Sequence, residues 1–263
     1  MSLGYVHSVE IGSFVDGPGT RFVVFLSGCP LSCQYCHNPD VCRVWGPRTD
    51  SDAMVAQIAR TAGFLRAGEG GVTISGGEPL AQAEFALDIV KGAKSLQLHT
   101  ALDTSGYLEE RVTAEMLDNL DLVLLDIKSF DPKTYREVTG VEVAPTLRLA
   151  ERLAAECKPV WIHFVLVPGL TDGTDNVVGL ARFVAGLSNV ERVDIVPFHQ
   201  MARHKWDDLG IPYKLKDTEP PTPAELRRVQ ELFEGEGVSV GVRHLAPCAA
   251  KNRSAEVTQH EHA

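Results

Sequence analysis

The sequence has no long apolar run, little positive charge and few cysteines. No stretch approaches the roughly 20 apolar residues that a membrane-spanning helix needs, and Met1–Glu10 lacks the basic and apolar segments of a secretory signal. Lysine and arginine number 25 against 35 aspartates and glutamates, and the resulting net charge of −10 disfavours nucleic acid as a partner. These absences predict a cytoplasmic protein that binds neither membrane nor nucleic acid.

The six cysteines are too few and too unevenly placed for a disulfide framework, because three of them crowd into one short segment. Such crowding is typical of metal or cluster ligands in a reducing compartment. The scattered Cys42, Cys157 and Cys248 are expected to be ordinary thiols without a role. The sequence also has no internal repeat and no low-complexity linker.

Short β-branched runs alternate with helical stretches, which indicates an α/β fold with a parallel sheet. A chain of 263 residues with 44% hydrophobic content is long enough for one barrel domain. The predicted strands are Arg21–Leu26, Gly71–Ser75, His99–Asp103, Leu122–Ile127, Val160–Val165 and Val193–Pro197. Six such units favour a wide, partly closed, TIM-like barrel over the eight-stranded closed form. We expect this domain to cover residues 1–242 and a polar tail to follow over 243–263.

The segments between the strands carry apolar residues at helical spacing and should cover the sheet. A stretch without clear periodicity, Gln200–Pro223, is predicted to be a long loop that could cover a site. The predicted helices are Ser51–Arg66, Ala81–Lys94, Leu147–Glu156, Asn176–Leu187 and Ala224–Glu234.

Cys29, Cys33 and Cys36 form a C-x3-C-x2-C motif directly after the first predicted strand. Three thiolates on one loop can hold three irons of a four-iron cluster and leave the fourth iron without a protein ligand. Electron carriers normally close such a cluster with four cysteines, so an open iron favours catalysis. A zinc site that adds His37 is an alternative. The adjacency of Cys36 and His37 and the lack of a second C-x2-C disfavour zinc.

The motif is embedded in a longer pattern, G-x-G-x-[KR]-x3-F-x2-G-C-x3-C-x2-C, whose other members are Gly17, Gly19, Arg21, Phe25 and Gly28. This run resembles the radical S-adenosylmethionine superfamily, and within it the activating enzymes of glycyl radical enzymes. The resemblance continues to about Tyr213. It runs through Gly76-Gly77-Glu78-Pro79, Asp103-Thr104-Ser105-Gly106, Asp126-Ile127-Lys128, Val167-Pro168-Gly169, Pro197-Phe198-His199 and His204-Lys205-Trp206.

The resemblance implies a partial (β/α)6 barrel, one 4Fe-4S cluster held by the three motif cysteines, and S-adenosylmethionine. The residues implied to contact this second cofactor are Tyr35, His37, Gly76, Gly77, Glu78, Lys128 and His199. Asp103, Thr104 and Asp126 resemble ligands of a monovalent cation beside it. Read from the residues alone, a salt-bridged rim explains the two acids equally well, and a glycine pair is commonly a turn.

The implied chemistry is reductive cleavage of S-adenosylmethionine to methionine and a 5′-deoxyadenosyl radical, which removes a hydrogen atom from a backbone glycine of a partner enzyme. No catalytic acid or base residue is expected, because the cofactors carry the chemistry. Asp16 belongs to a segment that in the family meets the partner. An Asx turn before Gly17 and Pro18 explains Asp16 equally well.

Pro39–Gly70 has no cysteine-rich insert, which favours pyruvate formate-lyase as the partner within this family. We expect a flavodoxin- or ferredoxin-type reductant and an enzyme that is monomeric on its own. His163 stands where close relatives commonly have arginine. We therefore expect a contact to the cofactor or to the partner to differ from that of the relatives at this position. Two alternatives stay open: a radical enzyme acting on a small molecule or nucleotide, and a noncatalytic iron–sulfur or zinc module.

Overall fold

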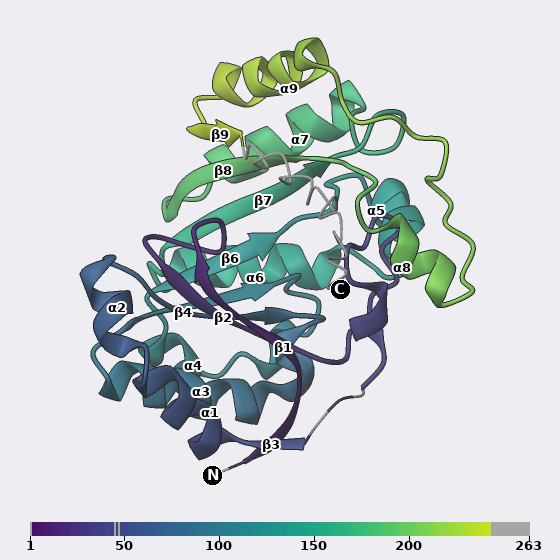
Figure 1. Cartoon of the computed structure of the whole chain (residues 1–263). Helices are drawn as coiled ribbons and strands as arrows, with labels where there is room; N and C mark the ends of the chain where they lie inside the picture. Colours follow the sequence, from purple (N-terminus) through teal and green to yellow (C-terminus); the bar gives the residue numbers. More distant parts are fainter. Residues whose placement is uncertain (1, 45, 47, 243–263) are drawn as a thin grey trace, which may run out of the picture.

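A computed structural model describes residues 2–44, 46 and 48–242 of the chain. The predicted polar tail 243–263, with Cys248, lies outside the described residues. All strands of the described part join one sheet, with helices α1–α4 at one end of it and α7 and α9 at the other (Figure 1). The single domain and its boundary at 242 stay predictions.

The sheet has nine strands in the order β3-β1-β2-β4-β5-β6-β7-β8-β9. From β2 onward neighbours are parallel, whereas β1 pairs with β2 and with β3 in antiparallel fashion. Because β3 and β9 are free edges in this order, the barrel is open. The strands are β1 Leu3–Ser13, β2 Arg21–Leu26, β3 Arg48–Asp50, β4 Gly71–Gly76, β5 His99–Thr104, β6 Leu122–Asp126, β7 Val160–Leu166, β8 Val190–Pro197 and β9 Val240–Val242.

The six predicted strands are confirmed as β2 and β4–β8, with ends shifted by at most three residues. The sheet extends beyond the prediction through β1, β3 and β9. β1 lacks the β-branched run of the others because it is an antiparallel strand with much of one side exposed. A partial (β/α)6 barrel therefore describes the centre of the sheet, with extra strands at both edges.

The helices follow the strands as expected, with a few differences. The predicted helix 51–66 is two helices, and the first is capped by the carboxylate of Asp50, which accepts from the Asp52 amide at 2.8 Å. Two short helices, α4 and α5, were not predicted. The helices are α1 Ser51–Ala59, α2 Ala62–Ala67, α3 Ala83–Ser95, α4 Ala114–Asn119, α5 Pro132–Thr139, α6 Ala144–Ala155, α7 Thr174–Ala185, α8 Arg203–Asp208 and α9 Pro223–Gly235.

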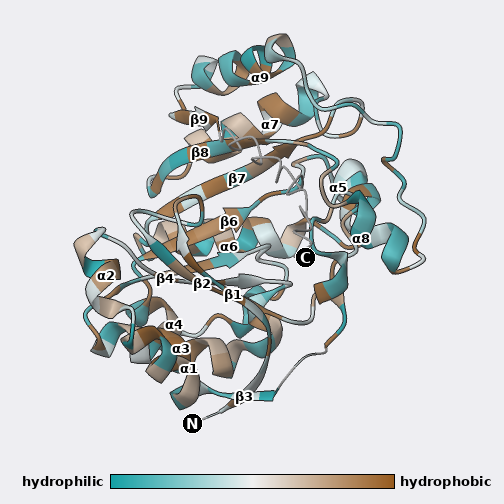
Figure 2. Ribbon diagram, in the orientation of Figure 1, coloured by the Kyte–Doolittle hydropathy of each residue, from teal (hydrophilic) through white to brown (hydrophobic). Residues whose placement is uncertain are grey.

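The two faces of the sheet differ in chemistry, and this difference positions the site. Along β4, Val72 and Ile74 join the main hydrophobic core, whereas the alternate residue Ser75 lines a cavity. On β7, Ile162 and Phe164 pack in the same core, and His163 lines the same cavity. Figure 2 shows the hydrophobic residues along these strands. The outer face is thus apolar under the helices and the inner face carries polar groups.

The segment 200–223 was predicted to be a loop, but it contains the helix α8. This short helix contacts the 3₁₀ helix η1, Pro39–Cys42, which follows the cysteine motif. The segment therefore contacts the chain next to the cysteine motif, and its role as a cover stays a prediction. No helix among the described residues is long and apolar enough to cross a membrane.

Candidate active site

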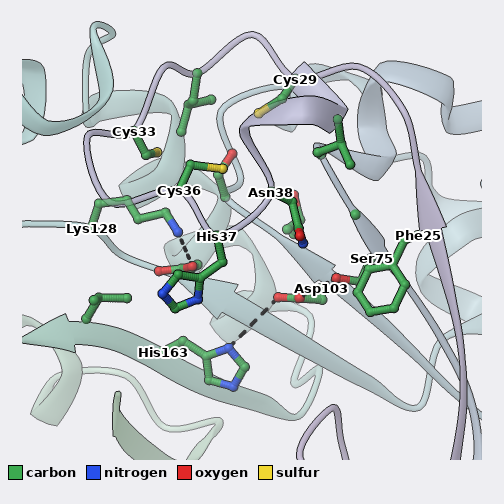
Figure 3. Close-up of a pocket in the computed structure, with 18 of the residues that line it drawn as sticks. Phe25, Cys29, Cys33, Cys36, His37, Asn38, Ser75, Asp103, Lys128 and His163 are labelled. Atoms are coloured by element: carbon green, nitrogen blue, oxygen red, sulfur yellow. Dashed lines mark hydrogen bonds and ion pairs between the residues drawn. The ribbon is translucent and has the colours of Figure 1, made fainter. Parts of the chain in front are cut away.

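One cavity of about 300 Å³ opens at the carboxyl ends of the parallel strands. It brings together side chains from β2, the cysteine loop, β4, β5, β6 and β7, as Figure 3 shows for the labelled residues. Of the predicted site residues, those that line it are Asp16, Cys29, Cys33, Tyr35, Cys36, His37, Gly76, Gly77, Asp103, Thr104, Asp126 and Lys128.

The cysteine loop is fastened to the end of α5. The backbone amides of Ser32 and Gln34 donate to the carbonyls of Thr139 and Val138 at 2.8 and 2.9 Å. The Gln34 side-chain amide also donates to the carbonyl of Glu137 at 2.6 Å. A segment that follows β6 thereby holds a loop that follows β2.

The same loop is fastened from its other side by α8. The indole Nε1 of Trp206 donates to the carbonyl of Cys36 at 3.0 Å, and Lys205 donates to Asn38 at 2.8 Å. Lys205 also pairs with Asp40 at 3.2 Å, and His7 Nε2 lies 2.9 Å from the other oxygen of that carboxylate. The resemblance included Lys205 and Trp206, and the structure gives both a physical role as anchors.

The glycine pair after β4 is required by close backbone packing. Gly76 has a φ of +117°, and a Cβ there would lie 2.2 Å from the amide nitrogen of Leu26. A Cβ on Gly77 would lie 2.4 Å from the carbonyl oxygen of Gly28. The pair therefore brings β4 against the start of the cysteine loop, and it lines the cavity at the same time.

The three motif cysteines differ in acidity. Burial raises the pKa of Cys29 and of Cys33 to about 12. A hydrogen bond from the thiol of Cys42 lowers the pKa of Cys36 to about 7, and the same bond raises the pKa of Cys42. Thiols must lose their protons to bind metal, so Cys36 is the easiest of the three to deprotonate.

Lys128 and Asp126 both line the cavity and form an ion pair. Although burial alone lowers the pKa of Lys128, the Asp126 carboxylate and the nearby Tyr35 and Cys33 raise it well above its usual value. The Lys128 ammonium also lies 5.7 Å from the centre of the Tyr35 ring. Lys128 is thus held as a cation inside the cavity, suited to an anionic ligand group.

Asp103 and His163 face each other across the strands (Figure 3). Asp103 accepts from the Ser75 hydroxyl at 2.7 Å, and its other oxygen lies 3.9 Å from His163 Nδ1. His163 Nε2 lies 3.7 Å from the buried carboxylate of Asp194. His163 therefore sits between two acids in the cavity wall.

Glu78, predicted to contact the cofactor, is not among the residues that line the cavity. Its carboxylate is fully buried and accepts from the Leu80 amide at 3.1 Å and the Thr104 hydroxyl at 2.6 Å. The other oxygen accepts from the amide and hydroxyl of Ser105 at 2.9 and 2.5 Å. Glu78 therefore ties the turn after β4 to the end of β5, because its oxygens are occupied by protein donors.

His199 is likewise outside the cavity lining, but it stacks on His37, with ring centres 4.0 Å apart. Burial lowers the pKa of His37 to about 4 and also lowers that of His199, so both rings are neutral near pH 7.

Asp16 lines the cavity from the β1–β2 turn, and its carbonyl accepts from the Thr73 hydroxyl at 2.5 Å. Thr73 in turn accepts from the buried guanidinium of Arg21 at 2.9 Å, so Arg21 positions that turn.

A family model described as the radical SAM superfamily matches residues 23–181. The pyruvate formate-lyase-activating enzyme of Staphylococcus epidermidis is 42% identical over 229 residues, which cover 84% of this chain and 91% of that protein. The pyruvate formate-lyase 1-activating enzyme of Escherichia coli is 37% identical over 241 residues, covering 90% and 98%. The chain belongs to the radical SAM superfamily.

Solved structures support the same fold for this radical SAM enzyme. A domain of a pyruvate-formate lyase-activating enzyme from Bacteroides vulgatus matches with a TM-score of 0.56 and 26% identity, covering 66% of this chain and 99% of that domain. A radical SAM methyltransferase from Sphaerobacter thermophilus matches with a TM-score of 0.62 at 16% identity, covering 91% and 77%, and bears on the fold alone.

The cavity fits the cofactors of the superfamily, a 4Fe-4S cluster and S-adenosylmethionine. Three thiols on one fastened loop supply the sulfur donors. Two buried polar atoms of the cavity residues, the Tyr35 hydroxyl and Asp126 Oδ1, have no hydrogen-bond partner among the described residues, which suits a polar ligand. Among the described residues, no group of three or more His, Cys, Asp or Glu side chains is placed to hold a single metal ion. The fit of the cluster therefore rests on the sulfur donors and on their enclosure in the cavity.

Sequence reasoning missed several residues of the cavity. Ser75 and Ser105 adjoin predicted residues and could have been found from their place at strand ends. Cys42 was assigned no role, because nothing in its spacing shows that η1 places it in the cavity lining. The others are Phe25, Leu31, Asn38, Val41, Val165 and Val196.

Proposed function

We propose that this radical SAM enzyme activates a glycyl radical enzyme, pyruvate formate-lyase, by removing a hydrogen atom from a backbone glycine. The observation that carries the proposal is a cavity in which the cysteine loop, the Lys128–Asp126 pair and Asp16 meet, in a chain whose relatives are activating enzymes over most of their length. The electron comes from a flavodoxin- or ferredoxin-type protein, and the enzyme is monomeric until its partner docks.

The predicted cluster and cofactor residues each have a place in this proposal. Cys29, Cys33 and Cys36 bind three irons, and Lys128 receives the carboxylate of S-adenosylmethionine. Tyr35, the neutral His37–His199 stack and the backbone at Gly76 and Gly77 enclose the rest of this cofactor. A monovalent cation is bound by Asp103, Thr104 and Asp126. Glu78 acts through the backbone that it positions.

The chemistry that the reduced cluster supplies when bound is one-electron cleavage of S-adenosylmethionine, which gives methionine and the 5′-deoxyadenosyl radical that takes the hydrogen atom. The protein's own residues orient and enclose the reactants. The apolar lining by Phe25, Leu31 and Val165 excludes water from the reaction. A general base is not needed, because the transferred species is a hydrogen atom.

The experiment that tests the proposed function is anaerobic incubation of the reconstituted enzyme with a reductant, S-adenosylmethionine and pyruvate formate-lyase. We expect a glycyl radical on the partner, detected by electron paramagnetic resonance, and an equivalent amount of 5′-deoxyadenosine. Omission of S-adenosylmethionine is the control. Deoxyadenosine without a radical on any glycyl radical enzyme would contradict the proposal and favour a small-molecule substrate.

Asp16→Asn should impair radical transfer to the partner more than it impairs cleavage of S-adenosylmethionine. Asp16 sits on the β1–β2 turn at the cavity margin, where a docked peptide would pass. Losing a charge-assisted hydrogen bond to peptide backbone removes about 1.5 to 3 kcal/mol, which lowers radical installation roughly tenfold to a hundredfold.

Both quantities are measured in the same anaerobic samples, the radical by spin counting and deoxyadenosine by chromatography. Asp118→Asn, an exposed acid on α4, is the matched control and should behave as the natural sequence. Equal losses of radical and deoxyadenosine in Asp16→Asn would assign Asp16 to the fold or to the cofactor instead.

A further inference from the structure

Asn176 is a buried polar side chain in the first turn of α7, and it is not among the residues that line the cavity. Its Oδ1 accepts three hydrogen bonds, from the Ser129 hydroxyl at 2.8 Å and from the amides of Phe130 and Asp131 at 2.8 and 2.9 Å. Its side-chain nitrogen donates to the Thr171 carbonyl at 2.8 Å. Asn176 therefore joins the segment that follows β6 to the segment that follows β7.

These partners fix the orientation of the Asn176 carboxamide. Backbone amides can only donate, so the atom that faces Phe130 and Asp131 is the oxygen. A carbonyl can only accept, so the atom that faces Thr171 is the nitrogen. An apolar side chain at this position would leave the two amides without their acceptor, which is costly away from water. The shape of the turn 129–131 therefore depends on a single side-chain oxygen.

The turn 129–131 directly follows Lys128, a cation that lines the cavity. On the other side of Lys128, the amide of Ile127 donates to the carbonyl of His163 at 3.1 Å. The backbone of Lys128 is thus held by β7 before it and by Asn176 after it. Because the Lys128 side chain lines the cavity, a shift of this backbone would move its ammonium relative to a bound ligand.

The same turn leads into α5. Asp131 caps the start of this helix, and its carboxylate accepts from the Thr134 amide at 2.7 Å. The other end of α5 fastens the cysteine loop, which α8 holds independently through Trp206. Loss of the Asn176 contacts should therefore disturb Lys128 first and leave the cluster ligands in place.

We propose that Asn176 is a positioning residue for S-adenosylmethionine, and that it acts by holding Lys128 where its ammonium meets the carboxylate of this cofactor. Asn176 itself touches neither the cofactor nor the cluster in this proposal. The inference rests on the proposed role of Lys128, but not on the identity of the partner enzyme.

The test compares two ligands, S-adenosylmethionine and its decarboxylated form, which lacks the group that Lys128 receives. Binding of each ligand to the reconstituted protein is measured by anaerobic equilibrium dialysis, without reductant or partner. In Asn176→Ala the dissociation constant of S-adenosylmethionine should rise about fivefold and that of the decarboxylated form less than about twofold, because a hydrogen bond to a charged group is weakened. Asn176→Asp keeps an oxygen acceptor for the three donors and should bind both ligands within about twofold of the natural protein.

A second comparison tests whether Asn176 acts through Lys128. Once Lys128→Ala has removed the ammonium, adding Asn176→Ala should change the affinity for S-adenosylmethionine by less than about twofold. Asn119→Ala is the matched control, because the Asn119 side chain donates only to the Glu115 carbonyl within α4. Iron and sulfide are measured on the same samples and should equal those of the natural protein in every variant.

An equal loss for the two ligands in Asn176→Ala would overturn the proposal, and so would a further loss of about fivefold in the Lys128→Ala background, because either result assigns Asn176 to the fold in general. Unchanged binding in Asn176→Ala, or an equally large loss in Asn176→Asp, overturns it as well. If Asn176→Ala does not fold, Asn176→Ser takes its place with the same expected loss, since its hydroxyl is too short to reach all three donors. Unchanged binding of S-adenosylmethionine in Lys128→Ala would instead show that the proposed role of Lys128 is wrong, and this inference with it.

Discussion

Replacing Cys29, Cys33 or Cys36 with alanine is expected to abolish the cluster completely. Each cysteine is one of three protein ligands in the proposed site, and the other two sulfurs cannot hold the assembly at the same position. Every step after cluster binding is lost with it. Iron and sulfide analysis after anaerobic reconstitution measures the loss, and visible absorption of the protein gives an independent readout.

The control variants for this prediction are Cys42→Ala and Cys157→Ala. Cys157 is exposed and distant in sequence from the motif, and Cys42 lines the cavity without belonging to the motif. Both should retain full iron content. Full iron in Cys33→Ala, or stoichiometric zinc with no iron in the natural protein, would show that the ligand assignment is wrong.

Glu78→Gln is expected to lower the free energy of unfolding by about 3 kcal/mol, because hydrogen bonds to buried charged groups are strong and unmatched donors are costly. The amide nitrogen that replaces one carboxylate oxygen would face the backbone amide of Ser105, which now donates to that oxygen at 2.9 Å. Neither group could accept from the other. Urea denaturation of the protein without cofactors, monitored by circular dichroism, measures this difference.

The exposed Glu84 on α3 offers a matched control, and Glu84→Gln should change stability by less than about 0.5 kcal/mol. The same pair of variants separates two roles for Glu78. A direct cofactor contact would weaken binding of S-adenosylmethionine and leave unfolding unchanged. If Glu78 instead links the turn after β4 to the end of β5, Glu78→Gln lowers the free energy of unfolding even without the cofactor. An unchanged free energy of unfolding in Glu78→Gln would contradict this structural role.

The centre of the sheet could be predicted from the sequence because its strands are buried on both faces. Such strands appear as β-branched runs, and β2 was located with both ends correct. The edge strands β1 and β3 have exposed positions and antiparallel partners, so their pattern is weaker. The short helix α8 has no buried residue, and its apolar periodicity is correspondingly absent.

The sequence could predict which residues lie near the site, but it could not predict where their side chains point. Strand ends place Asp103 and Asp126 at one mouth in any parallel sheet. By contrast, only the folded chain shows that Glu78 turns into the protein and meets Thr104 and Ser105, since sequence spacing carries no information on such a contact. The place of Cys42 in the cavity lining has the same origin, because it depends on where η1 begins and ends.

The fastening of the cysteine loop by α5 and α8 has a consequence for synthesis of the protein. The Ser32 hydroxyl and the Trp206 indole reach partners 107 and 170 positions away along the chain. Translation produces the three cysteines early and Trp206 near the end, so the nascent loop is first an unsupported segment with accessible thiols. Its final shape appears after nearly all of the chain has emerged. Ordered delivery of iron and sulfide therefore belongs after translation, and the interval before it is when the thiols are most open to oxidation.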